Sequence, residues 1–90
     1  MDGLGEFFLR NVIPTPTHGV GEIEFGLVED GEMRLDVVDM QGRVIGGIVT
    51  GSPGAGVYRV GVDARGLSAG VYMVILRAGR GVASTALVVE

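Results

Sequence analysis

Apolar and polar residues alternate in short stretches along most of the chain. In residues 21 to 28 and 32 to 39, an apolar residue recurs at every second position. Because successive side chains of a strand point to opposite faces, this period predicts two strands that each bury one face. The core residues predicted for these strands are Ile23, Phe25, Leu27, Met33, Leu35 and Val37.

Strand signals recur at intervals of roughly 8 to 12 residues, which is typical of a β-sandwich. A first strand is predicted at residues 6 to 13, and Pro14 and Pro16 end it because proline cannot donate to a sheet ladder. Another strand is predicted at residues 43 to 49, in which a central glycine pair predicts a bulge or a bend between sheets. The core-facing residues predicted for the last three strands are Tyr58, Val60, Val62, Tyr72, Val74, Leu76, Ala83, Thr85, Leu87 and Val89.

A tight corner is predicted just before the penultimate strand. Gly70 allows the backbone to turn sharply, and Tyr72 follows two residues later. In a tyrosine corner of this kind the hydroxyl bonds to the backbone a few residues upstream. We therefore expect Tyr72 to be buried, with its hydroxyl bonded within residues 63 to 68. The fold class we predict is an all-β, immunoglobulin-like antiparallel β-sandwich of about seven strands.

The last two strands, residues 71 to 77 and 82 to 89, are predicted to pair as an antiparallel hairpin across residues 79 to 81. Their face away from the core is unusually apolar. Either the first strand covers it with Phe7 and Phe8, or it forms a surface patch or exposed edge that binds a partner or a second copy of the domain. The apolar residues of this outer face are Val71, Met73, Ile75, Val82, Ala86 and Val88.

The 90 residues suffice for one domain with a single two-layer core. Hydrophobic residues make up 47% of the chain, and the many valines fit the β class because β-branched side chains suit a pleated surface. No internal repeat is apparent. We predict that residues 1 to 8 are a linker or part of an edge strand and that residues 9 to 90 form the single domain.

The formal net charge is −4, with 11 acidic residues against 7 basic ones, all of them arginine. Nucleic-acid binding is not expected, because contact with phosphates requires a basic stripe and none is visible. The longest apolar run, residues 71 to 76, is far shorter than the roughly 20 residues of a membrane-spanning helix. We therefore predict no membrane span.

The chain offers little for catalysis. His18 is the only histidine, there is no cysteine or lysine, and we interpret His18 as a solvated loop residue. Catalysis, a cofactor and a metal centre of the usual zinc type are therefore not expected. The acidic residues Glu29, Asp30, Glu32, Asp36 and Asp39 are interpreted as an ordinary solvated turn and its surroundings, with a weak cation site as the alternative.

Three parts of the chain resemble motifs of one known family. Residues 11 to 19 are similar to its Tyr-Pro-Asn-Pro segment with a following glycine, and residues 34 to 44 to its strand, Tyr-Asp turn, glycine and basic residue. Residues 67 to 74 are similar to its Leu-x-x-Gly-x-Tyr corner, and residues 87 to 89 to its terminal strand. In this order they resemble the type A C-terminal sorting domain of type IX secretion substrates. The sorting residues implied by the resemblance are Pro14, Pro16, Gly19, Asp39, Gly42, Arg43, Leu67, Gly70, Tyr72, Leu87, Val88 and Val89.

The sequence departs from the family pattern at four positions. Thr15 replaces the usual asparagine between the prolines, Ile13 and Val38 replace aromatic residues, and Ala86 stands where the family usually has lysine.

The resemblance implies a non-enzymatic export signal attached to an upstream cargo domain. The cargo would cross the periplasm, the outer-membrane secretion machinery would recognise the signal, and a sortase-like protease would remove it as the cargo reaches the cell surface or the extracellular space. The alternative is an immunoglobulin-like structural or assembly module, similar to that of flagellar hook-capping proteins or adhesins, with no sorting role.

Overall fold

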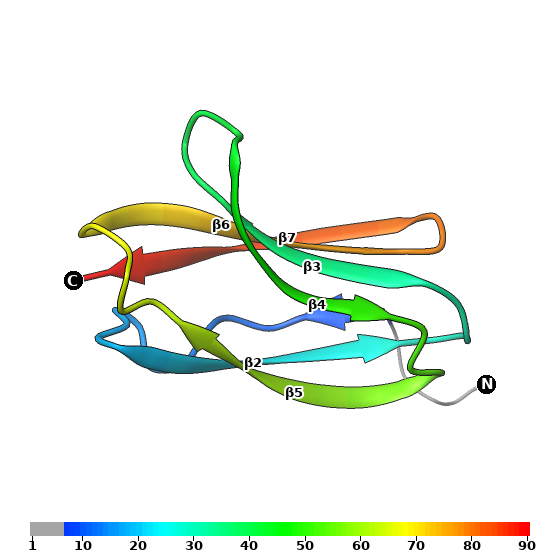
Figure 1. Ribbon diagram of the computed structural model, residues 1–90. Coiled ribbons are helices and arrows are strands. Elements are labelled where there is room, and N and C mark those ends of the chain that lie inside the picture. Colours follow the sequence, from blue (N-terminus) through cyan, green and yellow to red (C-terminus); the bar gives the residue numbers. More distant parts are fainter. Residues whose placement is uncertain (1–6) are drawn as a thin grey trace.

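The computed structural model describes residues 7 to 90, apart from the side chains of residues 47 to 49, as two antiparallel β-sheets packed face to face (Figure 1). The described chain contains seven strands and no helix, which confirms the predicted all-β sandwich. The strands are β1 (Phe8–Leu9), β2 (Val20–Leu27), β3 (Met33–Val38), β4 (Val44–Gly51), β5 (Gly56–Asp63), β6 (Gly70–Ala78) and β7 (Gly81–Val89).

One sheet has the strand order β1-β2-β5 and the other has the order β4-β3-β6-β7. The hairpin predicted for the last two strands is confirmed as β6 and β7, whose register runs without interruption from Gly70 opposite Val89 to Ala78 opposite Gly81. The turn between them is shorter than predicted, because Gly81 already belongs to β7.

The core lies between the sheets and consists largely of the residues that the alternation predicts. All six residues predicted for β2 and β3 are buried, and Leu35 has no exposed surface. Val74, Leu76 and Leu87 are also 0% exposed and come from β6 and β7. Tyr58 is only half-buried, but its ring stacks on the fully buried Phe25 with the ring centroids 5.6 Å apart. The predicted strand faces are therefore confirmed.

The first strand ends earlier than predicted, and residue 6, where the prediction begins it, lies outside the described residues. From residue 7 onward, only Phe8 and Leu9 of this segment pair regularly with β2. Beyond them the chain still follows β2, since the backbone N–H of Ile13 donates to the carbonyl oxygen of Glu22 at 2.9 Å. The segment leaves this sheet at Pro14, where the sequence predicts its end.

The first strand does not cover the apolar outer face of β6 and β7. The ring of Phe8 lies over Gly26 of β2, in the space that a side chain there would occupy. The ring of Phe7 lies against Gly81 and packs on the core. A side chain in place of either glycine would crowd the ring that lies over it. Neither glycine lies on the outer face of β6 and β7. The interpretation that Phe7 and Phe8 cover this face is therefore wrong.

The outer face of the four-stranded sheet is open along β6 and β7 but closed along β3. Val71 is 45% exposed and Val82 is 65% exposed. In β3, by contrast, Asp36 and Val38 are buried although the alternation directs them away from the core. The register of β4 against β3 shifts twice, on either side of the glycine pair, which confirms the predicted bulge. The hairpin of β3 and β4 curls out of the plane of the sheet (Figure 1).

Candidate functional site

The proline-containing segment and the last residues of the chain are joined by backbone hydrogen bonds. The N–H of Thr17 donates to the carbonyl oxygen of Val88 at 2.7 Å, and the N–H of Glu90 donates to that of Thr17 at 3.2 Å. Thr17 thereby forms a parallel bridge with Val89 at the free edge of β7. The proline-containing segment is thus paired with the end of β7, although the two lie far apart in the sequence.

Thr17 is buried at this junction, and its side chain also orders the proline segment. Its hydroxyl donates to the carbonyl oxygen of Pro14 at 2.7 Å, and the residue has no exposed surface. Pro14 and Pro16 themselves are exposed. Nδ1 of the exposed His18 lies 3.3 Å from the carbonyl oxygen of Glu90, so this histidine adds a weak contact to the same junction.

The segment continues to Gly19, which connects it to the link between β5 and β6. Gly19 has a φ of +88°, a conformation that residues other than glycine rarely adopt. Its carbonyl oxygen accepts a hydrogen bond from the N–H of Ala64 at 2.7 Å. This glycine therefore allows the proline segment to reach the corner before β6.

The predicted tyrosine corner is present at the start of β6. The hydroxyl of Tyr72 donates to the carbonyl oxygen of Ser68 at 2.7 Å, within the predicted segment, and Gly70 has a φ of +152°. The predicted burial of Tyr72 is wrong in part, because the side chain is only half-buried. Ser68 and Gly70 are exposed at the end of the sandwich, so the hydrogen bond forms at the surface. Leu67 packs against the core beside it.

A second corner of the same kind precedes β5, and the sequence analysis missed it. The hydroxyl of Tyr58 donates to the carbonyl oxygens of Gly54 at 2.8 Å and Pro53 at 2.7 Å. The tetrapeptide Ala-Gly-Val-Tyr occurs at both corners, in residues 55 to 58 and again in residues 69 to 72. The prediction of no internal repeat was wrong at this local level, and the repeated tetrapeptide was the signal.

The turn between β3 and β4 is closed by Asp39. Its Oδ1 accepts hydrogen bonds from the backbone N–H groups of Gln41 and Arg43, and its Oδ2 accepts one from Nε of Arg43, each at 2.9 Å. These bonds, above all the one from the Arg43 backbone, hold the pKa of Asp39 below its usual value. Gly42 adopts a φ of +85° within the turn.

The chain matches one family model. The model of the secretion system C-terminal sorting domain covers residues 11–90. The chain belongs to this family. No curated protein and no solved structure matches it. The domain is thus a C-terminal sorting signal of the type IX secretion system, which directs export through the outer membrane to the cell surface or the extracellular space. Its partners are a cargo precursor and the secretion machinery, and the match favours sorting over the assembly module.

Most of the motif residues of this sorting domain gather at one end of the sandwich, where the C-terminus lies (Figure 1). Gly70 and Tyr72 stand opposite Val89 and Leu87 in the pairing of β6 with β7. Thr17 adds the proline segment to the same place. The turn of Asp39, Gly42 and Arg43 is separate, because it belongs to the protruding hairpin of β3 and β4.

The gathered motif residues divide into a buried and an exposed group. Leu87 is 0% exposed and Val89 is 5% exposed, so their side chains are part of the core. Val88, between them, points to the outer face and is half-buried. Pro14 and Pro16 are exposed on the adjoining segment. At this end of the domain the accessible motif surface therefore includes the two prolines and part of Val88.

The acidic residues of the turn between β2 and β3 do not gather into a cluster of metal ligands. In residues 7 to 90 no group of three or more histidine, cysteine, aspartate or glutamate side chains could hold a metal ion. Asp30 instead accepts a hydrogen bond from the N–H of Ala55 at 2.8 Å. It thus ties this turn to the loop before β5. No helix in the described part of the chain is long and apolar enough to cross a membrane.

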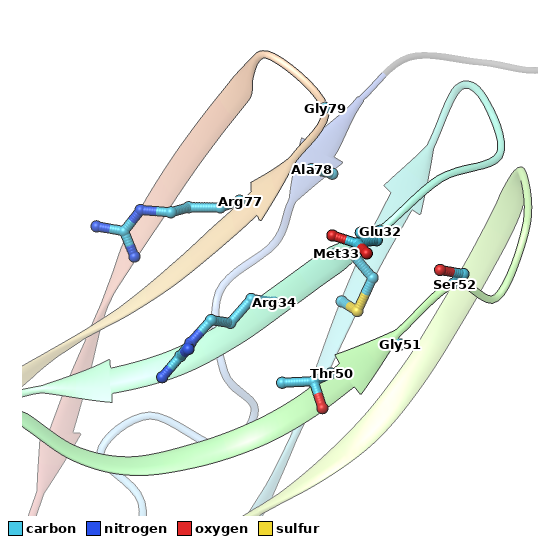
Figure 2. A pocket seen from close by; sticks show the side chains of 9 residues that line it. All are labelled: Glu32, Met33, Arg34, Thr50, Gly51, Ser52, Arg77, Ala78 and Gly79. Atoms are coloured by element: carbon cyan, nitrogen blue, oxygen red, sulfur yellow. The ribbon is translucent and has the colours of Figure 1, made fainter.

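An open cavity of about 470 Å³ lies on the four-stranded sheet, away from the motif residues (Figure 2). Arg34 and Arg77 stand opposite each other across β3 and β6, and Figure 2 shows their guanidinium groups pointing away from Glu32. Oδ2 of the buried Asp36 lies 2.6 Å from Nε of Arg34 and 3.9 Å from a terminal nitrogen of Arg77. This carboxylate offsets the repulsion between the two arginines, which makes the cluster a structural one.

Proposed function

We propose that the secretion machinery reads the end of the sandwich at which the proline segment, the tyrosine corner and the last residues of β7 meet. The observation that carries the proposal is the pair of backbone hydrogen bonds between Thr17 and residues 88 and 90. They hold the first and the last motif in one fixed arrangement, so a partner can contact both at once. A preorganised surface of this kind binds without the entropic cost of ordering its parts.

The motif residues have different roles in this proposal. Leu87 and Val89 shape the surface from the core, and Leu67, Gly70 and Tyr72 fix the corner beside it. Pro14, Pro16 and Val88 provide the contact area, because they are exposed or half-buried. Gly19 fixes the path of the proline segment. The turn of Asp39, Gly42 and Arg43 forms a second contact on the protruding hairpin.

The arrangement of the chain leaves this surface accessible when a cargo precedes the domain. The ring of Phe7 lies against Gly81, next to the turn between β6 and β7. That turn lies at the end of the sandwich opposite the C-terminus (Figure 1). An upstream cargo therefore lies away from the recognition surface. The proposal includes removal of the domain from the cargo by a sortase-like protease and assigns no catalysis to the domain itself.

Val88→Asp tests the proposal at a single side chain. The domain is fused behind a reporter that carries a signal peptide, in a host with a type IX system, and reporter at the cell surface and in the medium is compared with reporter in the periplasm. Val57→Asp is the matched control, because Val57 is 57% exposed and lies on the other sheet. Val57 follows the glycine of its corner, as does Val71, the residue opposite Val88 in the pairing of β6 with β7. We expect Val88→Asp to fold and to block export, and Val57→Asp to be exported. Normal export of a folded Val88→Asp variant would overturn the assigned surface.

A further inference from the structure

The two sheets of the described chain have four edge strands, namely β1, β5, β4 and β7. An edge strand presents unpaired N–H and C=O groups to which another strand can add. Proteins usually prevent this with short edges, charged side chains, proline or bulges.

Three of the edges carry such a device. β1 contains only two residues. β4 changes register against β3 at two places, which disrupts a regular ladder. β5 carries the charged side chain of Arg59, which is 67% exposed and lies 3.5 Å from the carboxylate of Glu24. Addition of a strand to any of these edges is therefore disfavoured.

β7 has none of these features. It is nine residues long and contains neither a charged residue nor a proline. Its pairing with β6 is regular from Gly81 to Val89, so its outer edge is straight as well. Among the described strands it is the one edge that is long, uncharged and unbulged.

The hydrogen bonds of Thr17 reveal which backbone groups of β7 point to the open side. The carbonyl of Val88 and the N–H of Glu90 face Thr17, away from β6. Backbone direction alternates along a strand, so the N–H and C=O groups of Val82, Ser84 and Ala86 face the same side. No strand of the described chain pairs with them there. Thr17 thus pairs with the last residues of this edge, and no strand of the described chain pairs with the rest of it.

We propose that the edge of β7 from Val82 to Ala86 accepts an extended segment of the secretion machinery as an additional strand. The pairing would continue the bridge that Thr17 begins, and backbone hydrogen bonds would supply its affinity. The partner segment is uncharged and carries apolar side chains on one face. A charged side chain there would lie beside Val82, which is 65% exposed, and the other apolar residues of the outer face.

The inference rests on the proposed sorting function, because it names the kind of contact that the machinery makes. Ser84→Pro tests it in the reporter fusion. Proline at this position removes an N–H that faces the open side and leaves the hydrogen bonds to β6 in place. Ser84→Ala is the matched control, since it removes the hydroxyl and keeps the N–H. We expect export to fall at least about fivefold for Ser84→Pro, the effect of one lost backbone hydrogen bond, and to be unchanged for Ser84→Ala.

Ser84→Lys provides a second variant that keeps the whole backbone and adds a charge to the edge, and circular dichroism of the isolated chain checks that each variant folds. Normal export of folded Ser84→Pro and Ser84→Lys would overturn the inference. If the unaltered fusion is not exported, the sorting function itself fails. Sedimentation velocity tests whether a second copy of the domain pairs with β7 instead. A dimer of the unaltered chain that Ser84→Pro dissociates would mean that a second copy, and not the machinery, pairs with this edge.

Discussion

The backbone N–H of Thr17 donates to the carbonyl oxygen of Val88 at 2.7 Å, and this bond joins the first motif of the sorting domain to the last. Thr17 lies outside the seven strands of the described chain and far from β7 in the sequence, and one parallel bridge, from Thr17 to Val89, connects them. Because Thr17 is completely buried and also bonds to Pro14, the geometry of the junction depends on this residue more than on the exposed prolines.

Thr17→Val retains the shape of the side chain and removes the hydroxyl that bonds to Pro14. We expect the free energy of unfolding to fall by about 0.5 to 1.5 kcal/mol, the net contribution of one hydrogen bond. Urea denaturation followed by circular dichroism measures the change. Thr15→Val is the control, because Thr15 is exposed and should tolerate the change. Equal stability of the two variants would show that the hydroxyl of Thr17 does not stabilise the junction.

Tyr72→Phe and Tyr58→Phe each remove the hydroxyl of one tyrosine corner. We expect each variant to lose about 0.5 to 1 kcal/mol, at the low end for a hydrogen bond because both tyrosines are only half-buried. The two corners lie at different loops and share no acceptor, so the losses should add in the double variant. Thermal or urea unfolding of the three variants tests this. Unchanged stability of both single variants would mean that the corners do not contribute.

Gly70→Ala should destabilise the domain through the backbone. A side chain at this position meets no atom within 4 Å, but the φ of +152° is one that other residues resist. We expect a loss of about 1 to 3 kcal/mol. Gly66→Ala is the control, because Gly66 has open space around it and no positive φ. Gly51 would not serve as a control, because it ends β4 with the same φ of +152°. Equal losses at positions 70 and 66 would contradict the assignment of the corner.

Stability should fall in acid partly because of Asp63. The side chain of Arg65, followed by its backbone N–H, holds the pKa of Asp63 far below the value of 3.8 for a free aspartate. A lowered pKa in the folded state stabilises the protein above the unfolded value, and this stabilisation disappears as the pH falls towards the folded value. The unaltered chain should therefore be more stable than Asp63→Asn at neutral pH, and the difference should shrink below about pH 4. Denaturant unfolding of both proteins across this range measures the difference, and a constant difference would contradict the role of the pair.

The strands and their faces were predictable because they depend on local alternation. Ile23, Phe25 and Leu76 are buried as their positions within each strand require. The spacing of Gly70 and Tyr72 predicted which segment accepts the hydrogen bond of the Tyr72 hydroxyl. The spacing did not predict that this hydrogen bond forms at the surface, because that depends on where the corner lies in the sandwich.

The long-range contacts were not predictable from the sequence pattern. Phe7 and Phe8 pack over glycines of two different sheets, and nothing in their own segment selects these partners. The pairing of Thr17 with β7 also depends on how the sandwich closes. For the proposed recognition surface, the resemblance indicated motif residues, and the fold determined which of them lie together.

Export of a reporter with and without the domain tests the sorting function itself. Residues 9 to 90 are fused behind a reporter with a signal peptide and expressed in a host with a type IX system, beside the same reporter without them and beside the fusion in a host that lacks the system. The fused reporter should reach the cell surface or the medium only when both the domain and the secretion system are present. Fused reporter that remains in the periplasm of the competent host, although the domain is folded, would contradict the sorting function.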